Sequence, residues 1–270
     1  MYDGEPDWDT YWRWEILHRR CDPIDFRRWK ADSSRALRGL PAGADRHDRP
    51  PRLLDSTCGL GHHAIVQCEL GFATEACDAN PRVLEAARAL IRAEDAHVPV
   101  FCGHWESLGQ LRPERYDLVF NDEIHQVRGH RALRAALEGI RGALRPGGWL
   151  VFFFADAAKP DDGPAQAEYE WNHMRRERVA WSLELQGLEV THLVQAERPE
   201  PDLVLEHHVY QVREPGRGTR EERTTMPRNY RWDWNHIVPV LEAAGFDQVE
   251  SHRFVNVHGH TYSMNLARRA

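Results

Sequence analysis

Between residues 52 and 154, short apolar runs alternate with segments whose apolar residues recur at helical spacing. The runs predict strands, and the segments between them predict amphipathic helices. The last run, Trp149–Phe154, is continuously apolar, as is typical of a strand buried on both faces. This alternation predicts parallel βαβ units in an open sheet with helices on both sides. The other predicted strands are Arg52–Asp55, Phe72–Cys77, Val98–Cys102 and Tyr116–Phe120.

The two ends of the chain follow other patterns. Residues 1–40 hold tryptophans and tyrosines among charges and predict two helices on either side of Pro23, and residues 41–51 predict a linker. Apolar and polar residues alternate in three late segments, which predict an antiparallel extension. These segments are Leu185–Gln195, Leu203–Arg213 and Arg220–Met226, and a helix at Ile237–Ala244 and a hairpin from Gln248–Val257 and Tyr262–Ala267 follow them.

We therefore expect three regions in this chain. Residues 1–45 form an N-terminal helical lid, and residues 46–155 form a core with a mostly parallel sheet. Residues 156–270 form the antiparallel extension and the C-terminal part of the same domain. The expected fold class is α/β with helices on both faces of the sheet.

Composition narrows the range of partners. Apolar residues make up 41% of the 270 residues, which is enough to build a core, and the net charge of -7 argues against nucleic acid. No apolar run approaches the ~20 residues of a membrane helix, so no membrane partner is expected. The N-terminus lacks the basic and apolar regions of a signal peptide. Five cysteines without C-x-x-C spacing indicate free thiols and a cytoplasmic protein.

One strand-to-helix junction carries candidate chemistry. The stretch from Asp55 through Gly59 to Gly61 reads D-S-T-C-G-L-G, and Asp78 closes the next strand. Glycines let a ligand approach the backbone, and the following helix N-terminus offers free N–H groups. An acid about 20 residues further on is placed to accept hydrogen bonds from ribose hydroxyls. A dinucleotide site of the form G-x-G-x-x-A, with Ala64 last, is one alternative at this point.

The same stretch resembles motif I of class I S-adenosylmethionine-dependent methyltransferases, in which an acid precedes G-x-G. Four later stretches are similar to further parts of that family, in the same order. They are its ribose-binding turn at 77–81, its adenine loop at 103–106, its motif IV at 116–121 and its PGG turn at 144–150. The resemblance covers roughly residues 52–155 and implies a Rossmann-like fold with S-adenosylmethionine as cofactor.

Several roles follow from this resemblance. Asp78 would hold the ribose, and Asp55 would support the glycine loop more than touch the ligand. His104 stands where the family has an acid, which puts that hydrogen bond to adenine in doubt, whereas Trp105 would stack on the base. The implied cofactor contacts in this region are Asp55, Gly59, Gly61, Asp78, Ala79, Asn80, His104, Trp105 and Asn121.

The outer regions resemble glycine N-methyltransferase and similar small-molecule N-methyltransferases. The N-terminal aromatic residues would either anchor two helices or cover the cofactor and offer π-faces to its sulfonium cation. The candidates for the covering role are Tyr2, Trp8, Tyr11 and Trp12, of which Tyr2 and Trp12 are the predicted cofactor contacts. Arg28 is the candidate for the methionine carboxylate, with Arg27 and Arg35 as rivals. After the fifth strand, residues 154–159 read F-A-D-A-A-K and lack the arginine that grips glycine in that family, which argues against glycine as acceptor.

The candidate catalytic residues are Glu123, Tyr210 and Tyr230, each able to assist an amine that must react in its neutral form. His125 is a further candidate base or a packed helix residue. Sixteen histidines raise the question of a metal, but their pairs lie on different elements and adjacent strand residues point to opposite faces. No metal site is therefore expected.

The preferred hypothesis is methyl transfer from S-adenosylmethionine to a small molecule, with nitrogen as the acceptor atom. The alternative is attack by the cofactor's own amine, which gives azetidine-2-carboxylate and releases methylthioadenosine. Binding of the cofactor without catalysis is a third hypothesis. The sequence leaves a homodimer open.

Overall fold

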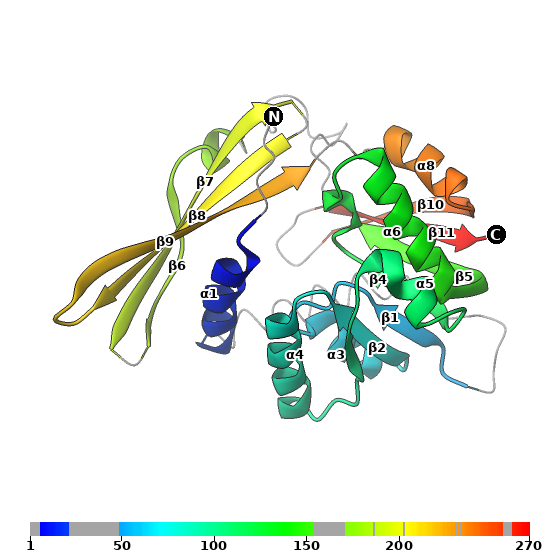
Figure 1. Ribbon diagram of the computed structural model, residues 1–270, viewed down its shortest axis with the longest axis horizontal. Helices are drawn as coiled ribbons and strands as arrows, with labels where there is room; N and C mark the ends of the chain where they lie inside the picture. The colour runs from blue at the N-terminus through cyan, green and yellow to red at the C-terminus, as the bar shows by residue number, and fades with distance from the viewer. Residues whose placement is uncertain are drawn as a thin grey trace. The chain divides into compact units, whose positions relative to one another are not determined.

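The computed structural model describes residues 6–21, 49–153, 171–185, 187–201, 203–229, 232, 234–255 and 261–270 (Figure 1). The chain divides into two compact units. We call Ile24–Ala155 with Trp232–Ala270 the core unit, and Met1–Pro23 with Asp156–Arg231 the antiparallel unit. No helix in the described ranges is long and apolar enough to cross a membrane.

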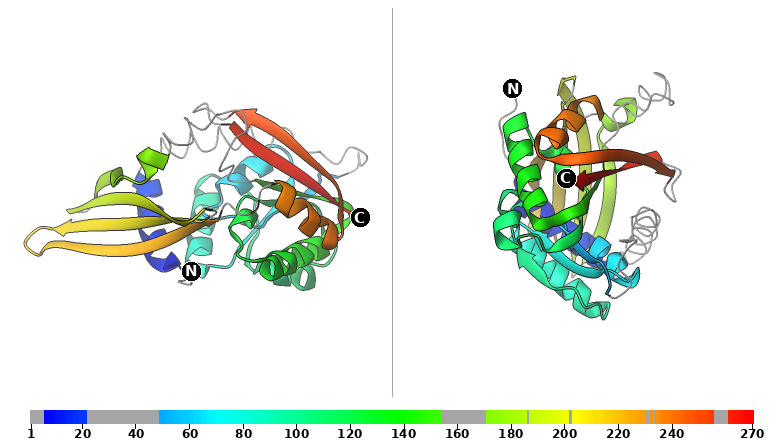
Figure 2. Two further views of the ribbon diagram at one scale, coloured as in Figure 1. Left: turned by 90° about the horizontal axis from the view of Figure 1, so that it is seen from above. Right: turned by 90° about the vertical axis from the view of Figure 1, so that its right-hand side faces the viewer.

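The core unit contains a seven-stranded sheet in the order β10-β11-β5-β4-β1-β2-β3. Strands β1 to β5 pair in parallel, whereas β11 is antiparallel to both β5 and β10 (Figure 2). The predicted mostly parallel sheet and its closing hairpin are therefore confirmed. The strands are β1 Arg52–Asp55, β2 Ala73–Asp78, β3 Val100–Cys102, β4 Tyr116–Asn121, β5 Leu144–Phe153, β10 Phe246–Val255 and β11 Thr261–Arg269.

Helices cover both faces of this sheet, as the alternating pattern predicts. The hydrophobic clusters place α3 (His62–Glu69) and α4 (Pro81–Ala93) on one face. They place α5 (Leu108–Leu111), α6 (His130–Ala143) and α8 (Trp234–Ala243) on the other. Two short 3-10 turns, η1 Trp105–Ser107 and η2 Ile124–Gln126, follow β3 and β4.

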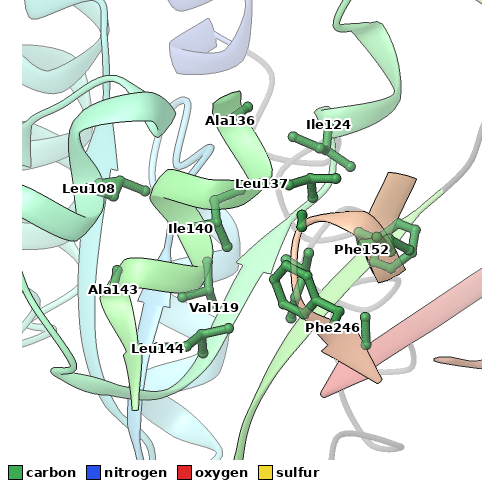
Figure 3. Close-up of a cluster of buried hydrophobic side chains, with 14 of the residues drawn as sticks. Leu108, Val119, Ile124, Ala136, Leu137, Ile140, Ala143, Leu144, Phe152 and Phe246 are labelled. Carbon is green, nitrogen blue, oxygen red and sulfur yellow. The ribbon is translucent and has the colours of Figure 1, made fainter. Parts of the chain in front are cut away.

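Helix α6 illustrates how the sequence builds this core. Its apolar residues recur every three or four positions, so Leu133, Leu137 and Ile140 lie on one face and are fully buried in the cluster against the sheet. Figure 3 shows Leu137 and Ile140 within this cluster. Gly139 lies on the same helix where it meets η1, and a Cβ added there would lie 2.1 Å from the Trp105 carbonyl oxygen. Glycine therefore permits a close backbone approach that periodicity alone does not reveal.

The start of β5 differs from the prediction. The sequence predicts a break at residues 146–148 and a strand from Trp149, but β5 begins at Leu144, which pairs with Tyr116. The pairing register then shifts, and Trp149 pairs with Leu118. Gly147 has φ +74° inside this irregularity. The proline and glycines therefore form a bulge within the strand instead of ending the helix before it.

The antiparallel unit holds a four-stranded sheet in the order β6-β7-β8-β9, in which all neighbours are antiparallel. The predicted antiparallel extension is confirmed, but the sequence interpretation missed β6 and placed Leu185 at the start of β7. Gly187, with φ +79°, lies in the turn between β6 and β7. The strands are β6 Arg178–Leu185, β7 Leu188–Glu200, β8 Leu203–Glu214 and β9 Gly218–Asn229.

Helix α1, Trp8–Cys21, belongs to the antiparallel unit. The Asp7 carboxylate accepts hydrogen bonds from the backbone N–H and the hydroxyl of Thr10 at 3.0 and 2.6 Å, which caps the start of the helix. The Trp14 ring then packs on Tyr210, with ring centroids 6.1 Å apart, and the two residues form a buried cluster with Val190 and Val212. This cluster holds α1 on one face of the sheet.

Candidate functional site

Three carboxyl groups gather at one edge of the core sheet. Asp55 and Asp78 end β1 and β2, and Asp122 directly follows β4. The strand order β4-β1-β2 makes these three strands neighbours, and all three run in parallel. Because the carboxyl ends of parallel strands meet at the same edge, the acids lie together where open α/β sheets bind ligands.

A glycine loop connects β1 to α3 at this edge. The Cys58 N–H donates to the Cys77 carbonyl at 3.0 Å, which ties the loop to β2. Gly59 and Gly61 have φ +47° and +88°, and a Cβ added to Gly61 would lie 3.3 Å from Ile91 on α4. The loop therefore needs glycine at position 61 both for its backbone conformation and for its close approach to α4.

Asp78 is integrated with this loop. Its Oδ2 accepts a hydrogen bond from the Gly59 N–H at 3.2 Å, and its Oδ1 accepts one from the Asn80 N–H at 2.9 Å. Burial raises the pKa of Asp78, although these backbone bonds oppose the shift. The Asn80 side chain accepts from the Arg82 N–H at 3.0 Å and so caps α4. Asp78 thus stands at the predicted ribose position, beside the loop.

Asp122 lies between the glycine loop and α3. Its Oδ1 accepts a hydrogen bond from the Thr57 hydroxyl, and its backbone N–H donates to the hydroxyl oxygen of Thr57 at 3.2 Å. The His63 Nε2 lies 3.5 Å from its Oδ2. Burial opposes ionisation of Asp122, but the His63 ring and the Thr57 hydroxyl outweigh burial and lower the pKa of this carboxyl. Asp122 therefore carries a negative charge at the edge.

Asp55 is the fully buried acid of the three. Its Oδ1 accepts from the Thr57 N–H at 3.3 Å, while its Oδ2 has no hydrogen-bond partner within the described residues. Burial, and then the charge of Asp122, raise the pKa of Asp55 well above its usual range. An unused buried acceptor beside an ionised carboxylate favours a ligand with cationic and hydrogen-donating groups. The amine, sulfonium and ribose of S-adenosylmethionine fit this donor set.

Asn121 and Trp105 support the glycine loop through hydrogen bonds to Ser56. The Asn121 side-chain amide donates to the Ser56 hydroxyl at 3.0 Å, and the Trp105 indole N–H donates to the Ser56 carbonyl at 2.8 Å. Asn121 is fully buried, and Trp105 is half-buried. These contacts give both residues a supporting position under the glycine loop.

The remaining predicted residues of the core unit lie around this edge. His104 is exposed, and its carbonyl accepts from the Ser107 hydroxyl at 2.8 Å in the turn after β3. The Ala79 carbonyl lies 3.7 Å from the Cys102 thiol. The Glu123 side chain is 47% exposed, and its carboxylate lies 4.0 Å from the Nε2 of buried His125. Glu123 is thus partly exposed to solvent and follows Asp122 directly in the sequence.

Two predicted residues lie in the other unit. Trp12 is half-buried on α1, where it meets Tyr11 edge to face at 5.3 Å. Tyr210 is fully buried on β8 and stacks on His192 at 4.4 Å. Burial raises the pKa of Tyr210, and its catalytic role stays a prediction. Tyr2, Arg28 and Tyr230, together with the rivals Arg27 and Arg35, lie outside the described residues.

The sequence interpretation missed the contact between His63 and Asp122. It considered the histidine pair at 62–63 only as a metal ligand. It placed Asp122 with its neighbours at a strand tip that binds ligands but assigned the chemistry there to Glu123. Where residues are described, no group of three or more His, Cys, Asp or Glu is placed to hold a metal ion. The available signal was the position of Asp122 at a strand tip that the parallel sheet brings beside the glycine loop.

Comparison with known protein families identifies this edge. Residues 53–148 match the family model described as "Methyltransferase domain". This part of the chain is therefore similar to methyltransferase domains. S-adenosylmethionine is the cofactor of that family, and the matched residues contain the glycine loop, Asp78 and Asp122.

Solved structures with the same fold span nearly the whole chain. The sugar N-methyltransferase KedS8 from Streptoalloteichus sp. is 19% identical, with a TM-score of 0.66, and the alignment covers 100% of this chain and 95% of that one. S-adenosylmethionine-bound CalS10, an amino pentose methyltransferase from Micromonospora echinaspora, is 20% identical over 90% of this chain and 92% of that one, with a TM-score of 0.59.

A third structure, the CcbJ methyltransferase from Streptomyces caelestis, is 20% identical over 89% of this chain and 96% of that one, with a TM-score of 0.58. At these identities the likeness establishes the fold. A search of the curated proteins found no match to the sequence.

Proposed function

We propose that the methyltransferase domain transfers a methyl group from S-adenosylmethionine to a nitrogen atom of a small molecule, and that an amino sugar is the acceptor class. The observation that carries the cofactor half of this proposal is the hydrogen bond from the Gly59 N–H to Asp78 Oδ2. It joins the glycine loop and the acid at the tip of β2 into one preassembled surface for a nucleoside.

Each acid at the edge has a distinct part in this proposal. Asp78 accepts hydrogen bonds from the ribose, and Asp122 supplies the negative charge that faces the cationic end of the cofactor. The bound cofactor supplies a methyl group on a positively charged sulfur that leaves readily. The protein's contribution is to align the acceptor with that methyl group and to exclude water.

An amine attacks only when its lone pair is free, so its proton needs an acceptor. Glu123 is the candidate for this role in the core unit, since its half-exposed carboxylate follows Asp122 at the same edge. The acceptor class rests on the related folds. KedS8 is described as a sugar N-methyltransferase and CalS10 as an amino pentose methyltransferase.

Product analysis tests the reaction. The protein is incubated with S-adenosylmethionine alone and then with a panel of amino sugars, and products are identified by mass spectrometry. We expect S-adenosylhomocysteine and a methylated amine only when an acceptor is present. Methylthioadenosine and azetidine-2-carboxylate formed together from S-adenosylmethionine alone, and absent without the protein, would instead establish the cyclisation alternative. Methylation at oxygen would overturn the nitrogen assignment.

The Asp78→Ala variant tests the cofactor site. We expect its affinity for S-adenosylhomocysteine to fall about 100-fold, because each lost hydrogen bond to a charged acceptor costs roughly 1.5–3 kcal/mol. Isothermal titration calorimetry measures the loss. Glu85→Ala, which removes an exposed acid from α4 in the same unit, is the matched control and should bind like the wild type. Equal affinity of the Asp78→Ala variant and the wild type would remove the basis for the site.

A further inference from the structure

Three acids at one edge pose an electrostatic problem. If Asp55, Asp78 and Asp122 were all ionised, their charges would repel one another across neighbouring strand tips. The charge of Asp122 contributes to the raised pKa of both Asp55 and Asp78. The edge therefore has one carboxyl whose ionisation is favoured and two whose ionisation is opposed.

The side chain that makes this distinction is His63. It lies on the first turn of α3, where its Nε2 is 3.5 Å from Asp122 Oδ2 and its ring packs on Phe120 at 4.6 Å. Only 12% of the side chain is exposed. A ring held by a neighbouring strand and directed at one carboxylate oxygen has few alternative positions.

Asp122 in turn fixes the glycine loop. Its second oxygen accepts the Thr57 hydroxyl, and its backbone N–H donates to that same hydroxyl oxygen. Thr57 also donates its N–H to Asp55. The contacts therefore run from α3 through the tip of β4 into the loop that follows β1.

We propose that His63 is a positioning residue, which holds the Asp122 carboxylate charged and in place to receive the amino-acid end of S-adenosylmethionine. This proposal rests on the proposed function, since it concerns the same cofactor. His63 then contributes to the affinity for the amino-acid end of the ligand alone, because the ammonium group of that end pairs with a carboxylate.

The pH dependence of binding follows from the groups that face Asp122. These are His63 from α3, Thr57 and the Cys58 thiol from the loop, and Asp55 and Asp78 from β1 and β2. Without His63, burial and the other two acids act on Asp122 with less opposition, and its pKa rises. The affinity of a His63→Ala variant should then fall more steeply with falling pH than that of the wild type.

Two probes separate the ends of the ligand. S-adenosylhomocysteine and methylthioadenosine share adenine, ribose and sulfur, but only the first carries the amino-acid end. By calorimetry we expect His63→Ala to weaken S-adenosylhomocysteine about 10-fold and methylthioadenosine less than twofold, because one charge-assisted contact is lost. His97→Ala, an exposed histidine of the same unit, is the matched control for both probes.

The possible results are distinguishable. Equal weakening of both probes would show that His63 merely supports the loop, and unchanged affinity for both would show that it has no role; either result overturns the proposal. A wild type that binds neither probe would instead overturn the proposed function. In an Asp122→Asn background, His63→Ala should cost less than twofold, and a further 10-fold loss there would show that His63 does not act through Asp122.

Discussion

The two units each contain a cluster of titratable side chains, and the clusters differ in what surrounds them. At the edge of the core sheet, Asp122 is 26% exposed and remains ionised beside His63. In the antiparallel unit, the Nε2 of His192 lies 2.9 Å from the Nδ1 of His208, beneath α1. The side chains of these two histidines are only 5% and 7% exposed.

Burial disfavours the charged form in both places, but only at Asp122 do neighbouring groups outweigh it. In the antiparallel unit it lowers the pKa of His192 to about 3 and that of His208 to about 4, so both rings are neutral. Glu15 and Glu206 lie 3.6 and 3.9 Å from the outer ring nitrogens, beyond hydrogen-bond distance. An ionised, partly exposed carboxylate such as Asp122 is typical of a ligand site. A buried neutral pair such as His192 and His208 is typical of a protein core.

The largest expected effect is the loss of stability of the antiparallel unit in acid. Because both folded-state pKa values are lowered, the unfolded chain binds more protons below about pH 6.5, and stability falls as the pH drops from there toward 4. Between pH 7.5 and 5 we expect a loss of about 2 kcal/mol per histidine. Hydrogen exchange of β7 and β8 across this range measures it.

Two variants sharpen that measurement. His192→Gln combined with His208→Gln removes both titrating rings. The opening free energy of β7 and β8 should then depend much less on pH. His252→Gln, which removes a half-exposed histidine of the core unit, should leave it unchanged. If the opening free energy of β7 and β8, derived from exchange rates corrected for the pH dependence of the exchange chemistry, stayed constant from pH 7.5 to 5 in the wild type, the pair would not be held neutral.

A smaller effect is expected from Glu15→Ala. The Glu15 carboxylate is buried and accepts a hydrogen bond from the Trp181 indole N–H at 3.2 Å, so alanine would leave that donor buried without a partner. We expect a loss of about 1–3 kcal/mol in the free energy of unfolding. Urea titration measures it, and Glu15→Gln, which retains an acceptor oxygen, should recover most of the loss. Equal stability of both variants would contradict a hydrogen-bonding role for Glu15.

The sequence predicted the core well because its pattern is local. Each strand of the parallel sheet is a short apolar run, and α6 shows its buried face through the spacing of Leu133, Leu137 and Ile140. The turn between β6 and β7 was missed because both strands share one alternating pattern on either side of Gly187. The bulge in β5 was missed because proline and glycine are equally typical of a helix end.

The candidate site was predicted only in part for a similar reason. The glycine loop and Asp78 are recognisable because an acid about 20 residues after a glycine turn has a physical meaning in this fold. The contact between His63 and Asp122 depends on the strand order β4-β1, which brings two distant segments together. No local pattern encodes that neighbourhood. Tyr210 shows the reverse case: its residue type suggests catalysis, but its full burial on β8 could not be read from the local pattern.

Tyr210→Phe gives the smallest expected effect and the finest test of the comparison. The Tyr210 hydroxyl is buried and has no hydrogen-bond partner within the described residues, so it gains nothing to offset its lost hydration. Phenylalanine keeps the ring that stacks on His192 and removes that cost, and we expect the protein to gain about 0.5–1 kcal/mol. Thermal unfolding would detect this as a rise in Tm of roughly 2 °C, with cofactor affinity and turnover unchanged. A loss of turnover at unchanged stability would instead place the hydroxyl in the reaction and remove the distinction between a sealed core and an open site.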